Sequence, residues 1–224
     1  MALLLCIDSS TTHASVAVAK DAVLLGIKTS ASQKEHASFL QPAIQNLLLE
    51  LGQELKQLDA IAVTTGPGSY TGLRVAMATA KGLSFALNIP LIGIPTTLVM
   101  SAAAREQLTE EAGFVLCPMI DARRMEVFTA IYSPQLELLS PITPKVLDAG
   151  SYEQELAKTP VYFFGDGAAK WQNICTSTNA RFISTNWNSK HMIAISERYY
   201  SQKQFLSLAY SAPEYGKGFH FGNQ

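Results

Sequence analysis

The residues best suited to chemistry are polar and glycine residues that directly follow two apolar, strand-like runs. Asp8, Ser9 and Ser10 follow the first run, 3–7, and the second run, 60–63, precedes Gly66, Gly68, Ser69 and Thr71. Carboxylates at strand ends can orient Mg²⁺ or phosphate, and glycines before a helix leave backbone amides open to an anion. These residues therefore indicate either a phosphate-binding site or tight turns that let another segment pack close.

The known phosphate-loop patterns do not occur in this segment. A Walker loop needs G-x-x-x-x-G-K-[ST] and a dinucleotide fingerprint needs G-x-G-x-x-G, whereas Gly66, Gly68 and Gly72 give G-x-G-x-x-x-G. What remains is a turn before a helix with Thr71 as its predicted N-cap, where helix-start amides favour an anion by only ~0.3–1 kcal/mol. For Asp8 a phosphate or metal role and an Asx-turn role stay open, and for Asp121, which ends a later strand-like run, the turn is favoured.

Neither a nucleophilic serine nor a metal site is predicted. Ser69 lacks the G-x-S-x-G elbow, because Pro67 and Thr71 stand where glycines would be needed. His36 opens a helical segment, and a metal site would require a second histidine four residues later, but position 40 is Leu40. We therefore interpret His36 as a helix-start residue.

Composition limits the classes of protein that need to be considered. Among 224 residues, 17 Lys and Arg nearly balance 18 Asp and Glu, so we expect poor RNA binding by the chain alone. The start, MALLLCIDSS, lacks a basic region and its apolar run is short, which predicts no export and no membrane span. Cys6, Cys117 and Cys175 are odd in number and far apart, which argues against a disulfide framework and favours a cytoplasmic protein.

Hydrophobic periodicity predicts an α/β protein built from a repeated plan. The order of elements in the first half is βββαβαβα, with strands at 3–7, 15–19, 23–29, 60–63 and 91–94 and helices from about 35, 73 and 96. A second pass begins with strands at 114–120 and 126–132, and later signals are a strand at 162–164 and a helix at 191–204. We therefore expect an N-terminal lobe at 1–106 and a partly degenerate C-terminal lobe at 114–224.

The predicted helix at 73–87 could offer a contact surface. It is rich in small residues, and Arg74, Ala78, Lys81 and Phe85 share one of its faces. The alternative is a tightly packed interior helix with two solvated cations. Periodicity leaves both interpretations open.

Three stretches together carry a family resemblance. CIDSSTTHASVAVA, LDAIAVTTGPGSYTGLRVAMATAKGLSFALNIPLIGI and IDARRMEVFTAIY resemble the TsaB (YeaZ) family of bacterial tRNA threonylcarbamoyladenosine biosynthesis proteins, and GDGA at 165–168 is a further landmark. The resemblance implies an actin-like, ribonuclease H-like ASKHA fold of two related βββαβα lobes. It also implies a noncatalytic subunit that pairs with the catalytic subunit TsaD and the ATPase TsaE to modify the adenosine next to the anticodon.

The resemblance implies a surface rather than a reaction centre. TsaD carries an H-x-x-x-H metal helix, and Leu40 departs from that pattern here, so no metal is expected. In the family the first two helices contact TsaD, or a second copy of the chain when TsaD is absent. Carried over, that contact falls on His36, Phe39, Leu40, Ala43, Leu47, Arg74, Ala78 and Lys81.

The remaining implications concern ligands and the tail. No tightly bound cofactor is expected, ATP or ADP is expected only at the partner junction, and tRNA is expected to bind only through the complex. The expected nucleotide or anion contacts are Asp8, Ser9, Ser10, Gly66, Gly68, Ser69 and Thr71. The family often ends in P-x-Y-L-R, whereas this chain ends in PEYGKGFHFGNQ, so its tail departs from the family pattern.

An enzymatic alternative is a small-molecule ASKHA kinase. It would place Asp8 near the γ-phosphate and would bind the nucleotide with the glycine segment, which is the stretch that contains Gly66 and Gly68. It is disfavoured because the second half has no clear glycine-rich adenosine loop. A metallopeptidase fails for lack of ligands.

Overall fold

The computed structural model describes residues 2–30 and 36–216, without the side chains of residues 36 and 37. The chain forms two compact units, one from residues up to Val99 with Trp187–Glu214 and the other from Met100–Asn186 with residues from Tyr215 onward. This division differs from the predicted continuous lobes 1–106 and 114–224. The reason is that the late helical segment returns to the first sheet, where the Cys6 thiol lies 3.5 Å from the Ser196 hydroxyl and Ser189 N donates to Ser15 Oγ at 2.8 Å.

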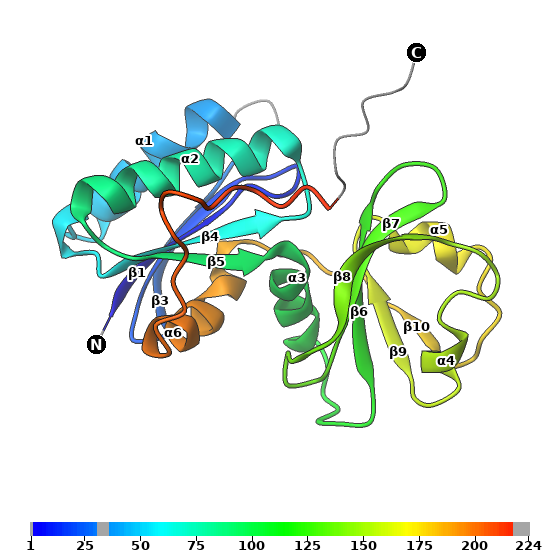
Figure 1. Ribbon diagram of the computed structural model, residues 1–224. Coiled ribbons are helices and arrows are strands. Elements are labelled where there is room, and N and C mark those ends of the chain that lie inside the picture. Colours follow the sequence, from blue (N-terminus) through cyan, green and yellow to red (C-terminus); the bar gives the residue numbers. More distant parts are fainter. Residues whose placement is uncertain (1, 31–35, 217–224) are drawn as a thin grey trace, which may run out of the picture. The chain divides into compact units, whose positions relative to one another are not determined.

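The first unit contains a five-stranded mixed sheet in the order β3-β2-β1-β4-β5 (Figure 1). Three antiparallel strands form a meander, and two parallel strands extend it beside β1. The strands are β1 (Leu3–Asp8), β2 (Ser15–Lys20), β3 (Val23–Thr29), β4 (Ala60–Gly66) and β5 (Leu91–Pro95). The predicted meander and the two following strands are confirmed.

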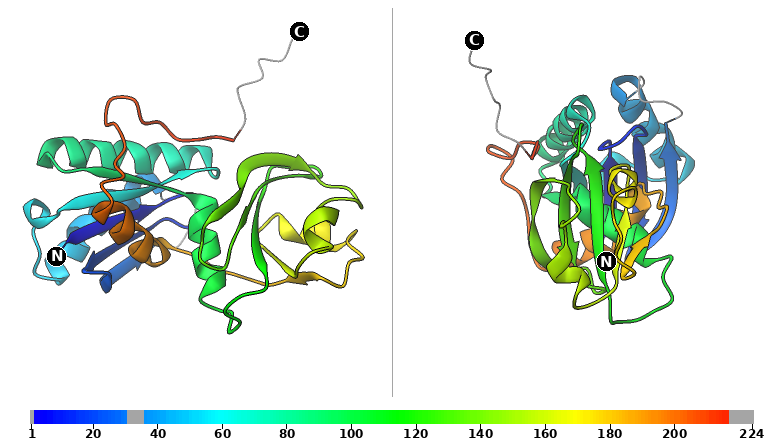
Figure 2. Two further views of the ribbon diagram at one scale, coloured as in Figure 1. Left: turned by 60° about the horizontal axis from the view of Figure 1, so that its bottom comes forward. Right: turned by 90° about the vertical axis from the view of Figure 1, so that its right-hand side faces the viewer.

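Helices cover both faces of this sheet (Figures 1 and 2). Helices α1 (His36–Glu50) and α2 (Tyr70–Leu87) lie on one face and α6 (Ile193–Ser201) on the other. Alternate β1 residues Leu3, Leu5 and Ile7 join the core beneath α1 and α2, whereas Cys6 points toward α6. All of β1 is buried, because a strand between helix layers has no solvent face. The other helical elements of this part are η2 (Leu55–Gln57), α3 (Thr96–Arg105), which continues past Val99 into the second unit, and η3 (Ser189–Met192).

The second unit repeats the same sheet plan. Its strand order β10-β9-β6-β7-β8 matches that of the first sheet when β6 is placed on β1. The strands are β6 (Val115–Asp121), β7 (Glu126–Tyr132), β8 (Leu138–Val146), β9 (Val161–Phe164) and β10 (Ala180–Phe182), with helices α4 (Glu153–Leu156) and α5 (Ala168–Gln172). The predicted α/β fold of two related βββαβα lobes is therefore confirmed.

The core of the second unit is aromatic. The Trp171 ring lies 4.5 Å from that of Phe163, and the Tyr152 ring lies 5.1 Å from each. Such tilted and edge-on pairs contribute about 0.5–1.5 kcal/mol each beyond the burial of their area. This cluster fixes α5 against the sheet and so positions the turn that precedes α5.

Candidate functional site

The polar end of β1 forms a buried turn. Asp8 is almost fully buried, and its Oδ1 accepts hydrogen bonds from Ser10 N at 3.0 Å, Ser10 Oγ at 2.7 Å and Thr64 Oγ1 at 3.0 Å. The bond from Ser10 N is that of an Asx-turn, and the bond from Thr64 ties the turn to the end of β4. One carboxylate oxygen thus joins the two segments that the sequence singled out.

The glycine segment packs directly against this turn. Ser69 N donates to Ser10 O at 2.8 Å, and a side chain on Gly68 would clash with that same carbonyl. The structure therefore brings together six of the seven predicted nucleotide contacts. These are Asp8, Ser9, Ser10, Gly66, Gly68 and Ser69.

The seventh predicted contact, Thr71, lies apart from this packed turn. It is exposed in the first turn of α2. Its predicted role as the N-cap is wrong, because α2 begins at Tyr70 and Ser69 Oγ accepts from Gly72 N at 3.3 Å. Ser69 therefore occupies the capping position, two residues before the one predicted.

The chain after α6 lies across the other side of the glycine segment. We call residues 205–214 the C-terminal strap. Leu206 N donates to Leu91 O at 2.8 Å on the edge of β5, and Glu214 N donates to Thr65 O at 2.7 Å. Gly66 has a φ of +116°, and a side chain there would overlap the Glu214 carbonyl. The absence of a side chain at Gly66 and Gly68 thus lets Glu214 and Ser10, respectively, pack closely against them.

The predicted contact face of α1 is mostly interior. Leu40, Ala43 and Leu47 are buried in the core of the first unit and present no surface to a partner, which corrects their predicted role. They point inward because the apolar stripe of α1 packs on the sheet. The helical spacing of the apolar residues therefore identified the side of α1 that faces the core. Phe39 is partly buried against the same core, and the side chain of His36 lies outside the described residues.

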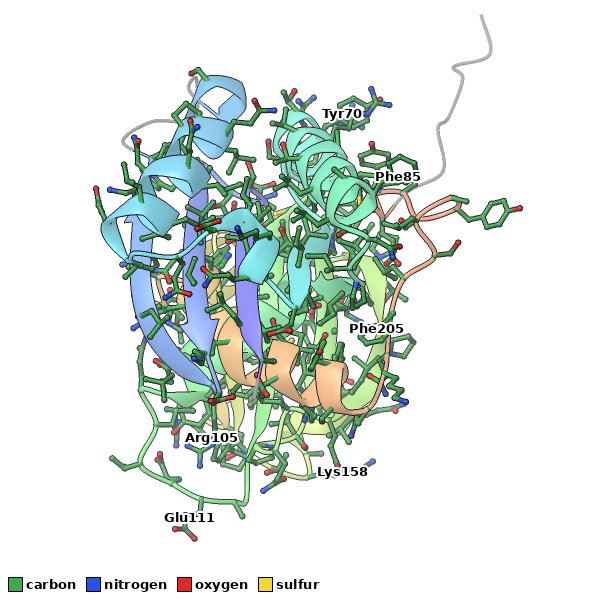
Figure 3. The ribbon with its side chains drawn as sticks, turned by 90° about the vertical axis from the view of Figure 1, so that its left-hand side faces the viewer. Tyr70, Phe85, Arg105, Glu111, Lys158 and Phe205 are labelled. Carbon is green, nitrogen blue, oxygen red and sulfur yellow. The ribbon has the colours of Figure 1, made fainter. Side chains whose placement is uncertain are left out.

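The predicted contact face of α2 is a real surface. Arg74 and Ala78 are exposed, and Phe85 is 80% exposed. The Arg74 guanidinium lies 4.0 Å from the centre of the Tyr70 ring, which is itself 42% exposed. Lys81 is half-buried and donates from Nζ to Ser211 O of the strap at 2.9 Å. Figure 3 shows Tyr70 and Phe85 on this helix.

Two of the thiols are buried, and the described residues hold no cluster of metal-ligating side chains. Burial raises the pKa values of Cys6 and Cys117 to about 12, so both thiols are held protonated. Within residues 2–30 and 36–216, no group of three His, Cys, Asp or Glu side chains is placed to hold a metal ion. Leu40 is fully buried among apolar side chains.

The same described residues contain no helix long and apolar enough to cross a membrane.

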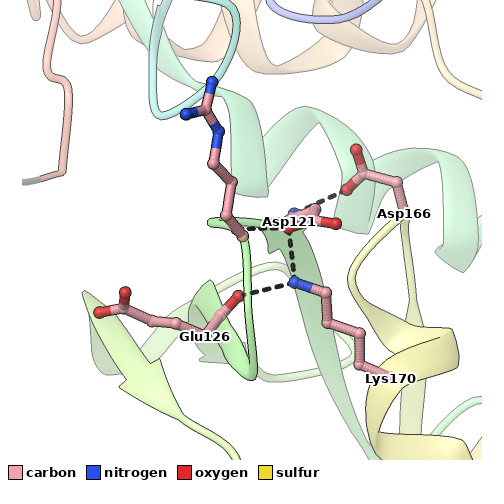
Figure 4. A network of polar contacts seen from close by, with 5 residues as sticks. Asp121, Glu126, Asp166 and Lys170 are labelled. Carbon is pink, nitrogen blue, oxygen red and sulfur yellow. Dashed lines mark hydrogen bonds and ion pairs between the residues drawn. The ribbon is translucent and has the colours of Figure 1, made fainter.

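Asp121 occupies the place in the second unit that Asp8 occupies in the first. Its Oδ1 accepts from Arg123 N and from Lys170 Nζ, the latter at 2.6 Å, and its own N donates to Asp166 Oδ1 at 2.8 Å (Figure 4). Partial burial acts to raise the pKa of Asp121, but the bonds from Lys170 and Arg123 lower it below its usual value. The turn interpretation of Asp121 is therefore supported.

The repeat extends to the glycine turns. Gly165 and Gly167 come just after β9, whereas Gly66 is the last residue of β4 and Gly68 comes two residues later; Gly165 has a φ of +100°. Gly167 N donates to Met119 O at 3.0 Å, which ties this turn to β6. Each unit thus joins an Asx-turn to a glycine turn, and in both units the observed contacts are structural.

A protein-family model matches most of the chain, and individual relatives match shorter parts of it. A family model described as "TsaD: tRNA N6-adenosine threonylcarbamoyltransferase" matches residues 12–214. The TsaB protein of Bacillus subtilis is 30% identical over 165 residues, which are 72% of this chain and 70% of that protein. The TsaB protein of Escherichia coli is 34% identical over 129 residues, 58% of this chain and 54% of that protein.

A solved structure supports the fold. YeaZ from Pseudomonas aeruginosa superposes with a TM-score of 0.79 at 24% identity, covering 96% of this chain and all of that one (100%). The Bacillus relative is named a tRNA threonylcarbamoyladenosine biosynthesis protein. The chain therefore belongs to the TsaB (YeaZ) family of tRNA threonylcarbamoyladenosine biosynthesis proteins.

Proposed function

We propose that this chain is a noncatalytic subunit that activates a TsaD-like catalytic subunit in tRNA threonylcarbamoyladenosine formation. A TsaE-like ATPase would complete the assembly, and tRNA would be bound through the complex. The observation that carries the proposal is the exposed face of α2, defined as Tyr70, Arg74, Ala78, Gly82 and Phe85. Family membership supplies the pathway in which this surface would act.

The composition of the α2 face suits a protein partner. Phe85 is a large apolar side chain held almost entirely in solvent, and burying such a side chain contributes about 1.5–3 kcal/mol. Arg74 is stacked on Tyr70, and aromatic residues and arginine are the types enriched at binding hot spots. The small residues Ala78 and Gly82 between them let a second helix approach closely.

The groups that could have served catalysis are used in packing. Asp8 ties two turns together, Gly68 admits Ser10, and Gly66 admits Glu214. A catalytic site needs groups that reach a substrate, whereas these contacts lie within the lobe. This favours a contribution by surface contact. From the family resemblance we further propose that ATP or ADP binds only at the partner junction and that the chain self-associates when the partner is absent.

The test is reconstitution of the modification with purified components. The TsaD-like and TsaE-like proteins of the same organism are incubated with tRNA, ATP and preformed threonylcarbamoyl adenylate as the activated donor, with and without this chain. Threonylcarbamoyladenosine is quantified by mass spectrometry of digested tRNA. We expect formation only when the chain is present together with its TsaD-like partner. Full activity without the chain, or formation by the chain alone, would contradict the proposal.

A further inference from the structure

Tyr210 is held in solvent by a fixed backbone. Its exposed fraction of 90% is the highest among the large hydrophobic side chains of the described residues. The strap that carries it is anchored on both sides, because Leu206 N bonds to Leu91 O at 2.8 Å and Glu214 N bonds to Thr65 O at 2.7 Å. A side chain presented by an anchored segment needs little further ordering when it binds a partner.

The turn at Tyr210 is also internally fixed. Ser211 N donates to Ser207 O at 2.9 Å, and Leu206 and Leu208 pack against the core of the first unit. The glycine at position 93 leaves room for Leu206, since a side chain there would lie 2.6 Å from Leu206 Cδ1. The exposure of Tyr210 is thus a property of a packed segment.

The strap turn borders the α2 face. Lys81 Nζ donates to Ser211 O at 2.9 Å, and Lys81 lies between Ala78 and Phe85 along the helix. Two views show the strap running beside α2 (Figures 1 and 2). Tyr210 is adjacent to Ser211, so the two exposed aromatics Phe85 and Tyr210 belong to elements that are joined by a hydrogen bond.

Area and charge indicate what would cover this surface. An exposed aromatic side chain can bury roughly 200 Å², so Phe85 and Tyr70 offer about 240 Å² of the ~800 Å² that each side of a standard interface needs. Tyr210 adds about 180 Å² on the same basis. The strap carries only one charged residue, the acidic Glu214, and α2 beside it carries only the cations Arg74 and Lys81, which are too few for the several phosphate contacts of an RNA site.

We propose that the strap turn around Tyr210 is a second contact element for the same TsaD-like partner that the α2 face binds. This inference rests on the proposed function. Tyr210 supplies an aromatic anchor on the strap, and the Lys81–Ser211 bond joins the turn that carries it to the helix that carries Phe85. The strap therefore has two roles, because it packs on the glycine segment and presents part of the interface.

The experiment compares three serine substitutions at exposed apolar positions. Tyr210→Ser removes the proposed anchor, and Phe85→Ser removes the α2 anchor. Val146→Ser, at a position 67% exposed on β8 of the second unit, is the matched control. The dissociation constant for the purified TsaD-like subunit is measured by isothermal titration calorimetry. Circular dichroism and urea unfolding verify that each variant is folded.

We expect Tyr210→Ser and Phe85→Ser each to raise the dissociation constant at least tenfold, and Val146→Ser to leave it unchanged. If Phe85→Ser weakens binding and Tyr210→Ser does not, the inference on the strap is overturned while the proposed function stands. If the wild-type chain does not bind, or neither aromatic substitution weakens binding, both fail. A Tyr210→Ser effect confined to self-association or to tRNA binding overturns the inference as well.

Discussion

Replacement of Gly66 by alanine tests whether the glycine segment is a packed turn. The new methyl group would overlap the Glu214 carbonyl, and the φ of +116° is one that side chains rarely adopt. Backbone strain of this kind costs about 1–3 kcal/mol. Displacing the strap also breaks the bond from Glu214 N to Thr65 O, which contributes about 0.5–1.5 kcal/mol. We expect a loss of about 2–4 kcal/mol in the free energy of unfolding.

Alanine substitutions at two other glycines separate the cost of backbone strain from the cost of displacing the strap. Gly113 has a φ of +85° with nothing within 4 Å of the added methyl, so Gly113→Ala reports backbone strain alone. Gly82 lies in α2 with open space around it, and Gly82→Ala should stabilise the helix by about 0.5–1 kcal/mol. All three variants are unfolded in urea. Hydrogen exchange of the Leu206 and Glu214 amides follows the strap directly.

The expected pattern is specific to the strap. Gly66→Ala should cost at least about 1 kcal/mol more than Gly113→Ala, and it should accelerate exchange at Glu214. Equal costs for the two variants, with unchanged exchange at Glu214, would refute the packing account of Gly66. In that case the absence of a side chain at Gly66 would need another explanation, such as close approach of a ligand.

Three further predictions concern burial and charge. With the chain folded at pH 8, Cys175 should react quickly with a thiol reagent while Cys6 and Cys117 react only on unfolding, because burial raises their pKa values to about 12; three equally fast thiols in a kinetic trace would contradict this. Leu47→Ala should lower the free energy of unfolding by about 2–5 kcal/mol in urea, since Leu47 lies in the core, and a cost under 1 kcal/mol would mean that it does not. The pKa of Asp121 is lowered in the folded chain. Ionised Asp121 therefore contributes to the free energy of unfolding at pH values above its unfolded pKa of about 3.9, and this contribution is lost as the pH falls through the folded pKa. Because that side chain is 39% exposed, Asp121→Asn should reduce the stability difference between pH 7 and pH 2.5 by only about 0.5 kcal/mol, and no reduction in paired urea titrations would argue against the Lys170 pair.

The first sheet could be predicted because its signals are local. Strands β1 to β5 are apolar runs bounded by turn residues, and β3 matches its predicted range. The strand β8 was missed because it lies at a sheet edge with exposed Leu139 and Val146 and contains Pro141 and Pro144. An exposed strand with prolines shows neither alternation nor a continuous apolar run.

The contact surface could be predicted only in part. On α2 the polar and small residues at helical spacing placed Arg74 and Ala78 on an exposed face. On α1 the family resemblance assigned Leu40 and Leu47 to the contact, but both are core residues, because the apolar face of this helix packs on its own sheet. The predicted cap Thr71 and the observed cap Ser69 are both hydroxyl residues, so residue type alone does not distinguish them.

The strap could not be predicted because its order depends on distant partners. Residues 205–214 show no period, and their backbone is fixed by Leu91, Thr65 and Lys81, which are more than 100 residues earlier in the chain. The glycines against which the strap packs could be picked out in the sequence. That the strap is the segment packed against them is shown only by the fold.

The proposal that this chain acts through the α2 face is tested by its affinity for the TsaD-like subunit. Ala78 is exposed in the middle of that face, so Ala78→Arg adds bulk and charge there without disturbing the core. Binding of this variant to the TsaD-like subunit is measured by isothermal titration calorimetry beside the wild-type chain, with urea unfolding of both. We expect a dissociation constant at least ~100-fold higher at an unchanged unfolding midpoint, since an unmatched charge at an interface centre costs several kcal/mol. Wild-type affinity in the folded variant would contradict it.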